Sequence, residues 1–448
     1  MNTSEPGRKT GLYIHIPFCV KKCNYCAFLS FDADTSPRKE YSEALINEIK
    51  MAARRYGNGA KRHIDTVYIG GGTPSVMDVS QMSLIMKAVR AEFDIDEDAE
   101  ITLEANPGTI GKTHRVTTAK LIAYKYMGVN RLSFGVQSMD NGRLSYLGRI
   151  HTMEDVERDI RYARDAGFDN INLDIIFSVP GETTEQALSD ARRIIALGPE
   201  HISCYSLQLE EGTPFFEMAE RGELREVDDE DDRRTYHRIC DLLAESGYEH
   251  YEISNFARTD VRPSPGFGGQ DADASPYRSK HNSSYWNLSE YIGVGLGASG
   301  FMDGVRYRNT SDLAEYLAIY GAGDIDMSPE STRRIMEEAY EERHENTPFD
   351  NASEAVFTGL RRREGVTYEE VLRAWDAAES TSGCTEERDP AETTSAADAE
   401  ERFWQLFPDA REEALEYRDR GPLQIDSEGM RLTREGIDIS NSIMSLFV

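Results

Sequence analysis

Short apolar segments alternate with amphipathic segments between residues 13 and 207, and this alternation constrains the fold more than any other feature. Strand-length apolar runs separated by segments of helical spacing are the pattern of βαβ units in a parallel sheet. Six units, in place of the eight of a closed barrel, predict an α/β fold, an incomplete TIM-like (β/α)6 barrel that is open on one side. The predicted strands are 13–16, 65–69, 100–105, 130–136, 170–177 and 201–207, and the predicted helices between them are 37–56, 79–93, 117–127, 153–166 and 185–197.

Polar and glycine residues stand where these predicted strands end. In barrels of this type the carboxyl ends of the strands carry the active site, so the sequence predicts one site at that end. Asp174 supports this placement, because a carboxylate on an otherwise apolar strand is costly unless it is paired or bound to a ligand. The strand-end residues are Cys19, Gly71, Glu104, Gln137, Asp174 and Gln208.

Three cysteines, Cys19, Cys23 and Cys26, follow the first predicted strand with the spacing C-x3-C-x2-C. Three thiolates can bind three irons of a [4Fe–4S] cluster and leave the fourth iron open to another ligand. Zinc is the alternative, but a structural zinc site needs four protein ligands, and His15 would have to be the fourth. A disulfide framework does not suit three cysteines so close together without a secretory signal. The spacing favours an open iron–sulfur site.

The remainder of the chain has a less regular pattern. Residues 258–280 are rich in Pro, Gly, Ser and Asp and predict a flexible insertion. A second segment, at about 376–401, is rich in Ser, Thr, Ala and Glu and predicts a disordered insertion. The predicted parts are a barrel domain at 1–257, the flexible insertion, a linker segment at 281–345 and a mainly helical C-terminal domain at 346–448.

Composition restricts the partners and the compartment. With 80 acidic against 50 basic residues, the formal net charge of −30 argues against nucleic acid, whose phosphates are bound by Lys and Arg. The excess of acidic residues instead predicts a hydrated surface. No apolar run is long enough to span a membrane, and residues 1–10 lack the apolar segment of a signal peptide. We therefore expect a cytoplasmic protein, in a reducing compartment that suits an iron–sulfur cluster.

The run Tyr-x-His-Ile-Pro-Phe-Cys that ends at Cys19, together with the spacing of the three cysteines, resembles the signature of the radical SAM enzymes. It is most similar to their coproporphyrinogen-dehydrogenase branch. The resemblance implies a radical SAM barrel whose open iron binds the amino and carboxylate groups of S-adenosylmethionine (SAM). Residues 354–361 and 432–437 resemble the small, winged-helix-like C-terminal domain of the same family.

The resemblance also implies contacts to SAM. The Gly-Gly-Gly-Thr-Pro run at 70–74 is similar to the motif that holds the methionyl amino group, and glycine there lets the backbone approach a ligand. Asp174 would bind ribose hydroxyls, Tyr25 would place its ring on adenine, and Gln208 is carried over by position alone. The implied SAM contacts are Tyr13, Tyr25, Gly71, Gly72, Thr73, Glu104, Gln137, Arg149, Asp174 and Gln208.

Two departures separate the chain from the coproporphyrinogen dehydrogenases. Those enzymes carry a fourth cysteine two residues after the third, where this chain has Phe28, and a long N-terminal extension, where only 18 residues precede Cys19. The segment His281-Asn-x-x-Tyr-Trp286 instead matches the HNxxYW motif of the HemW haem chaperones. Imidazole is a common axial ligand of haem iron, so we expect an exposed His281 to bind haem. A structural, hydrogen-bonded His281 is the alternative.

The resemblance therefore implies a haem chaperone that binds a [4Fe–4S] cluster, SAM and haem and delivers haem to acceptor proteins, without coproporphyrinogen oxidase activity. The alternative is an oxygen-independent coproporphyrinogen III dehydrogenase, which decarboxylates propionate side chains by radical chemistry. A radical SAM enzyme with an unrelated substrate also stays open, because barrel motifs do not specify the substrate. Expected partners are haem-accepting proteins, an electron donor for the cluster and a second copy of the chain, with membrane contact only through partners.

Overall fold

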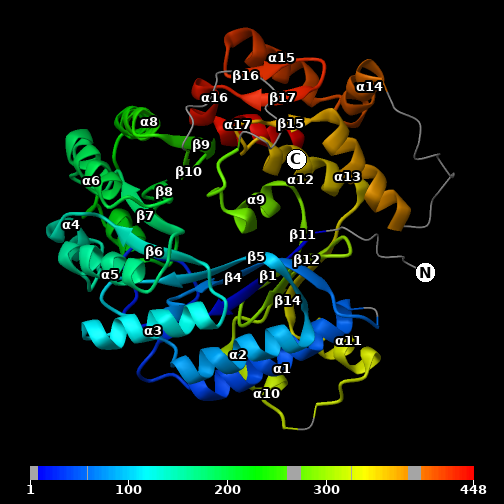
Figure 1. The fold of residues 1–448 in the computed structure, drawn as a ribbon. Coiled ribbons are helices and arrows are strands. Elements are labelled where there is room, and N and C mark those ends of the chain that lie inside the picture. Colours follow the sequence, from blue (N-terminus) through cyan, green and yellow to red (C-terminus); the bar gives the residue numbers. More distant parts are fainter. Residues whose placement is uncertain (1–8, 58, 260–273, 324, 382–394) are drawn as a thin grey trace.

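A single large sheet forms the centre of the computed structural model, which describes residues 9–57, 59–259, 274–323, 325–381 and 395–448 (Figure 1). Its strand order is β14-β13-β12-β11-β1-β4-β5-β6-β7-β8-β10-β9. Six neighbours in this order are parallel, as predicted, and confirm the α/β barrel class. They are β1 (Thr10–Ile16), β4 (His63–Gly71), β5 (Asp94–Ala105), β6 (Arg131–Gln137), β7 (Ile171–Phe177) and β8 (His201–Ser206).

Helices cover the outer face of these strands. On β6, the apolar side chains of Leu132, Phe134 and Val136 are buried in the core, while the alternate residues face the barrel interior. Helices α5 and α6 begin at capping boxes, in which Thr152 and Thr183 satisfy free backbone N–H groups. The barrel helices are α1 (Arg38–Tyr56), α2 (Val79–Glu92), α3 (His114–Tyr126), α4 (Asn141–Tyr146), α5 (Met153–Asp165), α6 (Thr184–Ala196), α7 (Pro214–Glu220) and α8 (Asp229–Glu245).

The sheet extends beyond the six predicted strands on both sides. At one edge β9 (Tyr248–Glu252) and β10 (Asn255–Arg258) form a hairpin beside β8. At the other edge β11 (Glu290–Val294) pairs in parallel with β1, and β12 (Ser299–Met302), β13 (Val305–Asn309) and β14 (Tyr340–Glu345) follow in antiparallel order. The prediction of a linker at 281–345 is therefore wrong, because backbone pairing with β1 makes this segment part of the barrel sheet. Helices α10 (Leu313–Tyr320) and α11 (Pro329–Glu338) lie against α1.

The predicted flexible insertion at 258–280 is partly ordered. Residues 260–273 lie outside the described part of the chain, so the prediction is not tested there. Beyond them, Ser275 donates to the carbonyl of Arg258, and Arg278 pairs with Glu249 and, at 2.7 Å, with Glu364. Helix α9 (Lys280–Trp286) begins at once, with Ser279 as its N-cap. These contacts correct the second half of the predicted range.

The C-terminal domain is mainly helical and carries a small antiparallel sheet in the order β15-β17-β16. Of the range predicted to be disordered, 382–394 lies outside the described residues, whereas 376–381 belong to α13 and 396–401 to α14. Burial of Ala399, Phe403 and Trp404 explains the order of α14. The elements are α12 (Pro348–Gly359), β15 (Val366–Thr367), α13 (Tyr368–Thr381), α14 (Ala396–Leu406), α15 (Ala410–Arg420), β16 (Leu423–Ile425), β17 (Gly429–Leu432), α16 (Arg434–Asp438) and α17 (Ser440–Met444).

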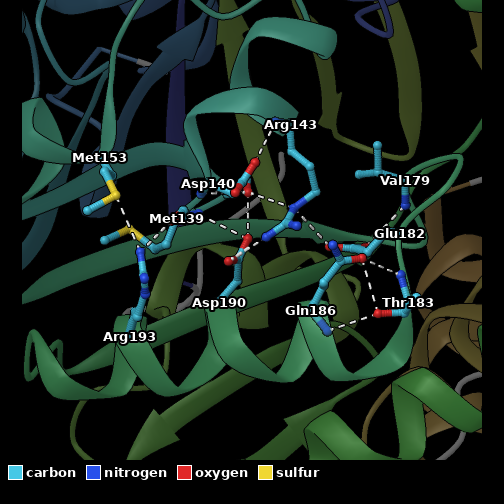
Figure 2. A network of polar contacts seen from close by, with 11 residues as sticks. Met139, Asp140, Arg143, Met153, Val179, Glu182, Thr183, Gln186, Asp190 and Arg193 are labelled. Atoms are coloured by element: carbon cyan, nitrogen blue, oxygen red, sulfur yellow. Dashed lines mark hydrogen bonds and ion pairs between the residues drawn. The ribbon is translucent and has the colours of Figure 1, made fainter.

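A buried polar network fixes the segment that follows β6 (Figure 2). Arg143 on α4 donates to Asp190 at 2.7 Å and lies 3.2 Å from Glu182. Asp190 also accepts the backbone N–H of Met139 at 3.0 Å, and Arg193 donates to the Met139 carbonyl at 2.9 Å. The network attaches the chain after Gln137 to α6. It thereby also fixes the turn after α4 that leads to Arg149.

Replacing Arg143 by methionine is expected to lower the free energy of unfolding by about 3 kcal/mol, because removal of one partner leaves buried carboxylates uncompensated. Urea unfolding of the full chain, followed by circular dichroism, measures the change. Arg420→Met is the matched control: Arg420 pairs with Glu416 on the exposed surface of α15, and its loss should leave stability nearly unchanged. Equal effects of the two variants would contradict this account of the network.

Candidate active site

The cysteine loop lies at the carboxyl end of β1 and is tied to neighbouring strand ends by backbone hydrogen bonds. Two short strands, β2 (Phe18–Cys19) and β3 (Phe31–Asp32), pair in parallel and hold the two ends of the loop together. The N–H of Thr73 donates to the Phe18 carbonyl at 2.8 Å, and the N–H of Asn24 donates to the Leu147 carbonyl at 3.0 Å. The loop is thereby attached both to the turn after β4 and to the turn after α4.

The three thiols are free and half-buried. The Cys19 Sγ lies 3.4 Å from the Thr73 hydroxyl, and Arg149 donates to the Cys23 Sγ at 3.4 Å. Burial raises the pKa of the Cys19 and Cys26 thiols. Such thiols need a bound cation or metal to become thiolates, which are the form that binds iron. Accessible thiols beside an arginine fit an iron–sulfur cluster.

His15 does not complete a zinc site. Its Nδ1 lies 2.9 Å from the Tyr13 hydroxyl and its Nε2 lies 3.3 Å from the Leu29 carbonyl, so both ring nitrogens are engaged. Burial lowers the pKa of His15 to about 4, and the ring is neutral. Within the described residues no three His, Cys, Asp or Glu side chains are gathered around a point that could hold one metal ion. Thiolates of a cubane cluster bind different irons and need not converge in that way.

The glycine run after β4 is the part of the site where side chains are excluded. A Cβ on Gly71, whose φ is +112°, would lie 2.6 Å from the His15 ring, and a Cβ on Gly72 would lie 2.8 Å from the backbone of Phe18. The N–H of Gly71 donates to Glu104 at 2.9 Å, and the Tyr68 hydroxyl donates to the other Glu104 oxygen at 2.7 Å. The glycine run thus lets the backbone lie directly against the cysteine loop, and its N–H orients Glu104 beside that loop.

Two buried carboxylates of the barrel, Glu104 near the end of β5 and Asp174 in the middle of β7, have raised pKa values. Burial raises the pKa of Glu104 to about 7, and the nearby charge of Asp174 adds to the shift. Burial also raises the pKa of Asp174, although Asn172 donates to its carboxylate at 2.7 Å. Buried carboxylates with raised pKa values are typical of ligand-binding and catalytic sites.

Gln137 and Arg149 contribute polar atoms that lack partners among the described residues, namely the Gln137 Oε1 and the Arg149 Nε. Gln137 ends β6 with a φ of 71°, a strained conformation for a residue other than glycine, and such strain clusters at functional sites. Arg149 donates to Asn106 at 2.7 Å. Unpaired polar atoms beside the thiols suit a polar ligand such as SAM.

Most of the predicted contacts therefore meet at one place, and a small pocket opens between Cys23, Thr73, Asn106 and Arg149. Tyr25 packs beside the apolar cluster of Leu147, Ile176, Val179, Phe215 and Leu224 at the barrel mouth. Gln208 is exposed just beyond the end of β8, and its contact with SAM stays a prediction. Sequence reasoning missed Asn106, which donates to the Thr73 hydroxyl at 2.7 Å, and Tyr68. Both lie on or directly after predicted strands, at positions that face the interior.

The prediction that His281 is exposed is wrong, because only 1% of its surface is accessible. Its Nδ1 lies 2.8 Å from the Thr66 hydroxyl and its Nε2 lies 2.7 Å from the Tyr285 hydroxyl. The ring stacks on Tyr68, and burial lowers its pKa to about 3. With both nitrogens engaged, His281 has the structural, hydrogen-bonded role and is not presented to haem.

Helix α9, which carries the HNxxYW motif, closes the amino end of the barrel. The backbone N–H groups of Lys280 and His281 donate to Glu100 in the middle of β5, each at 3.1 Å. On its other side, the guanidinium of Arg361 lies 4.3 Å from the Trp286 ring centre, so α9 contacts the C-terminal domain. Figure 1 shows α9 between the large sheet and the C-terminal helices. The motif therefore joins the two parts of the molecule.

Comparison with known proteins supports this arrangement. The pattern of the radical SAM superfamily matches residues 13–194. A heme chaperone HemW from Lactococcus lactis is 35% identical over 80% of this chain and 83% of its own, and one from Escherichia coli is 37% identical over 67% and 72%. The structure of coproporphyrinogen III oxidase (HemN) from Escherichia coli, a radical SAM enzyme, matches 99% of this chain and 90% of its own with a TM-score of 0.74. At 21% identity this last likeness concerns the fold alone.

A parallel barrel with three cysteines in the loop after its first strand is the arrangement of the radical SAM superfamily, and the chain belongs to it. Within the superfamily it belongs with the relatives named heme chaperone HemW, which it matches over most of both chains. No helix in the described part of the chain has the length and apolar character needed to cross a membrane.

The raised pKa of Glu104 predicts a pH dependence of stability. The folded protein holds this proton more tightly than the unfolded chain, whose Glu has its ordinary pKa of 4.5. The stabilisation is therefore complete below pH 4.5 and is lost as the pH rises through about 7. Between about pH 5 and pH 8, the free energy of unfolding should fall more steeply in the cofactor-free wild type than in Glu104→Gln.

Urea unfolding of the two proteins across this pH range measures the difference. Glu97→Gln is the control, because Glu97 lies on the same strand but is exposed, and its curve should follow the wild type. Parallel curves for wild type and Glu104→Gln would show that Glu104 has no such role.

Proposed function

We propose that this chain is a haem chaperone, which holds a [4Fe–4S] cluster and SAM in its barrel, binds haem and delivers it to acceptor proteins. The observation that carries the proposal is its 35% identity, over most of both chains, to a protein named heme chaperone HemW. The Phe28 position, where the coproporphyrinogen dehydrogenases have a fourth cysteine, is consistent with it.

Residues at the carboxyl end of the barrel would hold the cluster and SAM. Cys19, Cys23 and Cys26 supply the thiolates, and Arg149 stabilises the charge beside Cys23. An iron–sulfur cluster with one open iron can bind SAM and transfer an electron to it. The backbone of 71–73 and the Glu104 carboxylate suit the methionyl amino group, Asp174 the ribose and Tyr25 the adenine. Gln137 contributes an unpaired amide oxygen, and Tyr13 orients His15 against Gly71.

The proposed function also implies a haem ligand and partner proteins. Because His281 is buried, we expect an accessible side chain to be the axial ligand. We expect haem-accepting proteins, an electron donor for the cluster and a second copy of the chain as partners, with no nucleic acid, since the net charge is −30. We expect the protein in the cytoplasm, whose reducing conditions suit such a cluster.

Alanine in place of Cys19, Cys23 or Cys26 is expected to abolish the cluster, because a cubane cannot be held by two thiolates. Iron and acid-labile sulfide content after anaerobic reconstitution measures this loss. Cys240→Ala is the control: Cys240 lies on α8, away from the loop, and its variant should retain the full content. Retention of the cluster in the loop variants would refute this part of the proposal.

An anaerobic titration with haemin, followed by the Soret band, tests haem binding. The wild type is expected to bind haemin saturably, and His281→Ala to bind the same amount below its melting temperature. That variant should lose about 2–4 kcal/mol of stability, because a buried ring is removed and two hydroxyls lose their partner. His344→Ala, at an exposed histidine, is the control for both measurements.

Two outcomes would change the assignment. Loss of haemin binding in a folded His281→Ala variant would make His281 a haem ligand after all. Absence of saturable binding in the wild type would favour the oxygen-independent coproporphyrinogen III dehydrogenase, with coproporphyrinogen III as the first substrate to assay.

A further inference from the structure

Arg131 is the largest fully buried side chain of the described structure, with 1% of its surface accessible. It lies at the start of β6 and faces the barrel interior, as do Ser133 and Gly135 further along the strand. Its guanidinium forms no hydrogen bond or ion pair with any described residue, and its Nε is enclosed without a partner. A buried guanidinium without a direct ion pair is costly, so this arginine is a candidate to bind an anionic partner.

The neighbouring strand supplies a second unpaired group. Thr102 on β5 is the register partner of Arg131, so both side chains point to the same face of the sheet. The Thr102 hydroxyl is also buried without a partner. One guanidinium and one hydroxyl, side by side and unpaired, form a set of donors that lacks an acceptor.

The histidines around Arg131 do not provide that acceptor. His201 is buried, with its Nδ1 at 2.6 Å from Asn172 and its Nε2 at 2.8 Å from the Tyr251 hydroxyl. Burial and the charge of Arg131 both lower the pKa of His201 and of His281, so both rings are neutral. Arg131 is therefore the cation that an anion would meet in this part of the interior.

Helix α9 lies on one side of Arg131, and two carboxylates lie on the other. Helix α9 closes the amino end of the barrel, through His281 and Glu100. Glu104 and Asp174 lie on the carboxyl side, within reach of the Arg131 charge, but neither forms an ion pair with it. An anion bound to Arg131 would therefore lie between α9 and these two carboxylates.

We propose that the barrel interior contains a carboxylate-binding site formed by Arg131 and Thr102. A guanidinium binds a planar carboxylate through two parallel hydrogen bonds, and the Thr102 hydroxyl can donate a third. A carboxylate carries the single negative charge that one guanidinium balances, whereas a phosphate dianion would keep a second, unbalanced charge near Glu104 and Asp174. The carboxylate belongs either to a small free acid or to a propionate arm of a bound porphyrin, and only the second source rests on the proposed function.

Sodium propionate is the probe. Thermal unfolding of the full-length wild type in propionate, against sodium chloride of equal ionic strength, should show a saturable rise in melting temperature, because a ligand that binds the folded state stabilises it. Arg131→Gln should lose the rise, Arg131→Lys should keep part of it, and Thr102→Val should weaken it. Arg143→Gln is the matched control, since Arg143 is a half-buried arginine outside the barrel interior and its variant should keep the full rise. The same rise in wild type and a folded Arg131 variant, or no rise in the wild type, would overturn the proposal.

Haemin and its dimethyl ester, which lacks free carboxylates, distinguish the two sources. If a porphyrin arm occupies the site, haemin abolishes the propionate-dependent rise and the ester does not. If a free acid occupies it, the rise persists in haemin-loaded protein. A propionate effect that depends on Arg131 in a protein that fails to bind haemin would support this site and refute the haem chaperone. Haemin binding without the propionate effect would support the haem chaperone and refute this site.

Discussion

In-register parallel pairing of the barrel strands is the constraint on which the site depends. Because Ile69 on β4 pairs with Leu103 on β5, the next positions bring the Gly71 N–H within 2.9 Å of Glu104. A one-residue slip would turn Glu104 toward the helices and remove it from the site. The cysteine loop contributes the thiols, but strand register decides which carboxylates, amides and hydroxyls they meet.

The barrel interior contains cations and anions that do not neutralise one another directly. Arg149 bonds to Cys23 and Asn106, and Glu104 bonds to Tyr68 and Gly71, so each charge is oriented by neutral groups. Direct ion pairs would have hidden these charges from a ligand. Preorganised, separate charges instead suit a molecule that carries both an ammonium and a carboxylate, as amino acids and their derivatives do.

Local patterns in the sequence were sufficient for the six parallel strands and for most of the strand-end residues, because a period of two and the glycine after a strand are local signals. They could not predict that β11 pairs with β1, because the residues of a strand do not specify which distant strand it pairs with. The error at His281 has the same origin: its burial depends on Thr66, 215 residues away in the chain. Polar composition before α9 suggested exposure, whereas hydrogen bonds to Glu100 fix the helix in the barrel end.

The chain leaves the described structure at Thr259 and returns at residue 274, and both ends lie at the amino side of the barrel. The Arg258 N–H donates to the Glu200 carbonyl beside the start of β8, and Ser275 donates to Arg258. The ordered ends are thus held together independently of what joins them. A sensor surface that holds the protein on this side would face the amino end of the barrel and leave the carboxyl end, which carries the three thiols, directed away from it, an orientation suited to electrochemistry of an air-sensitive centre.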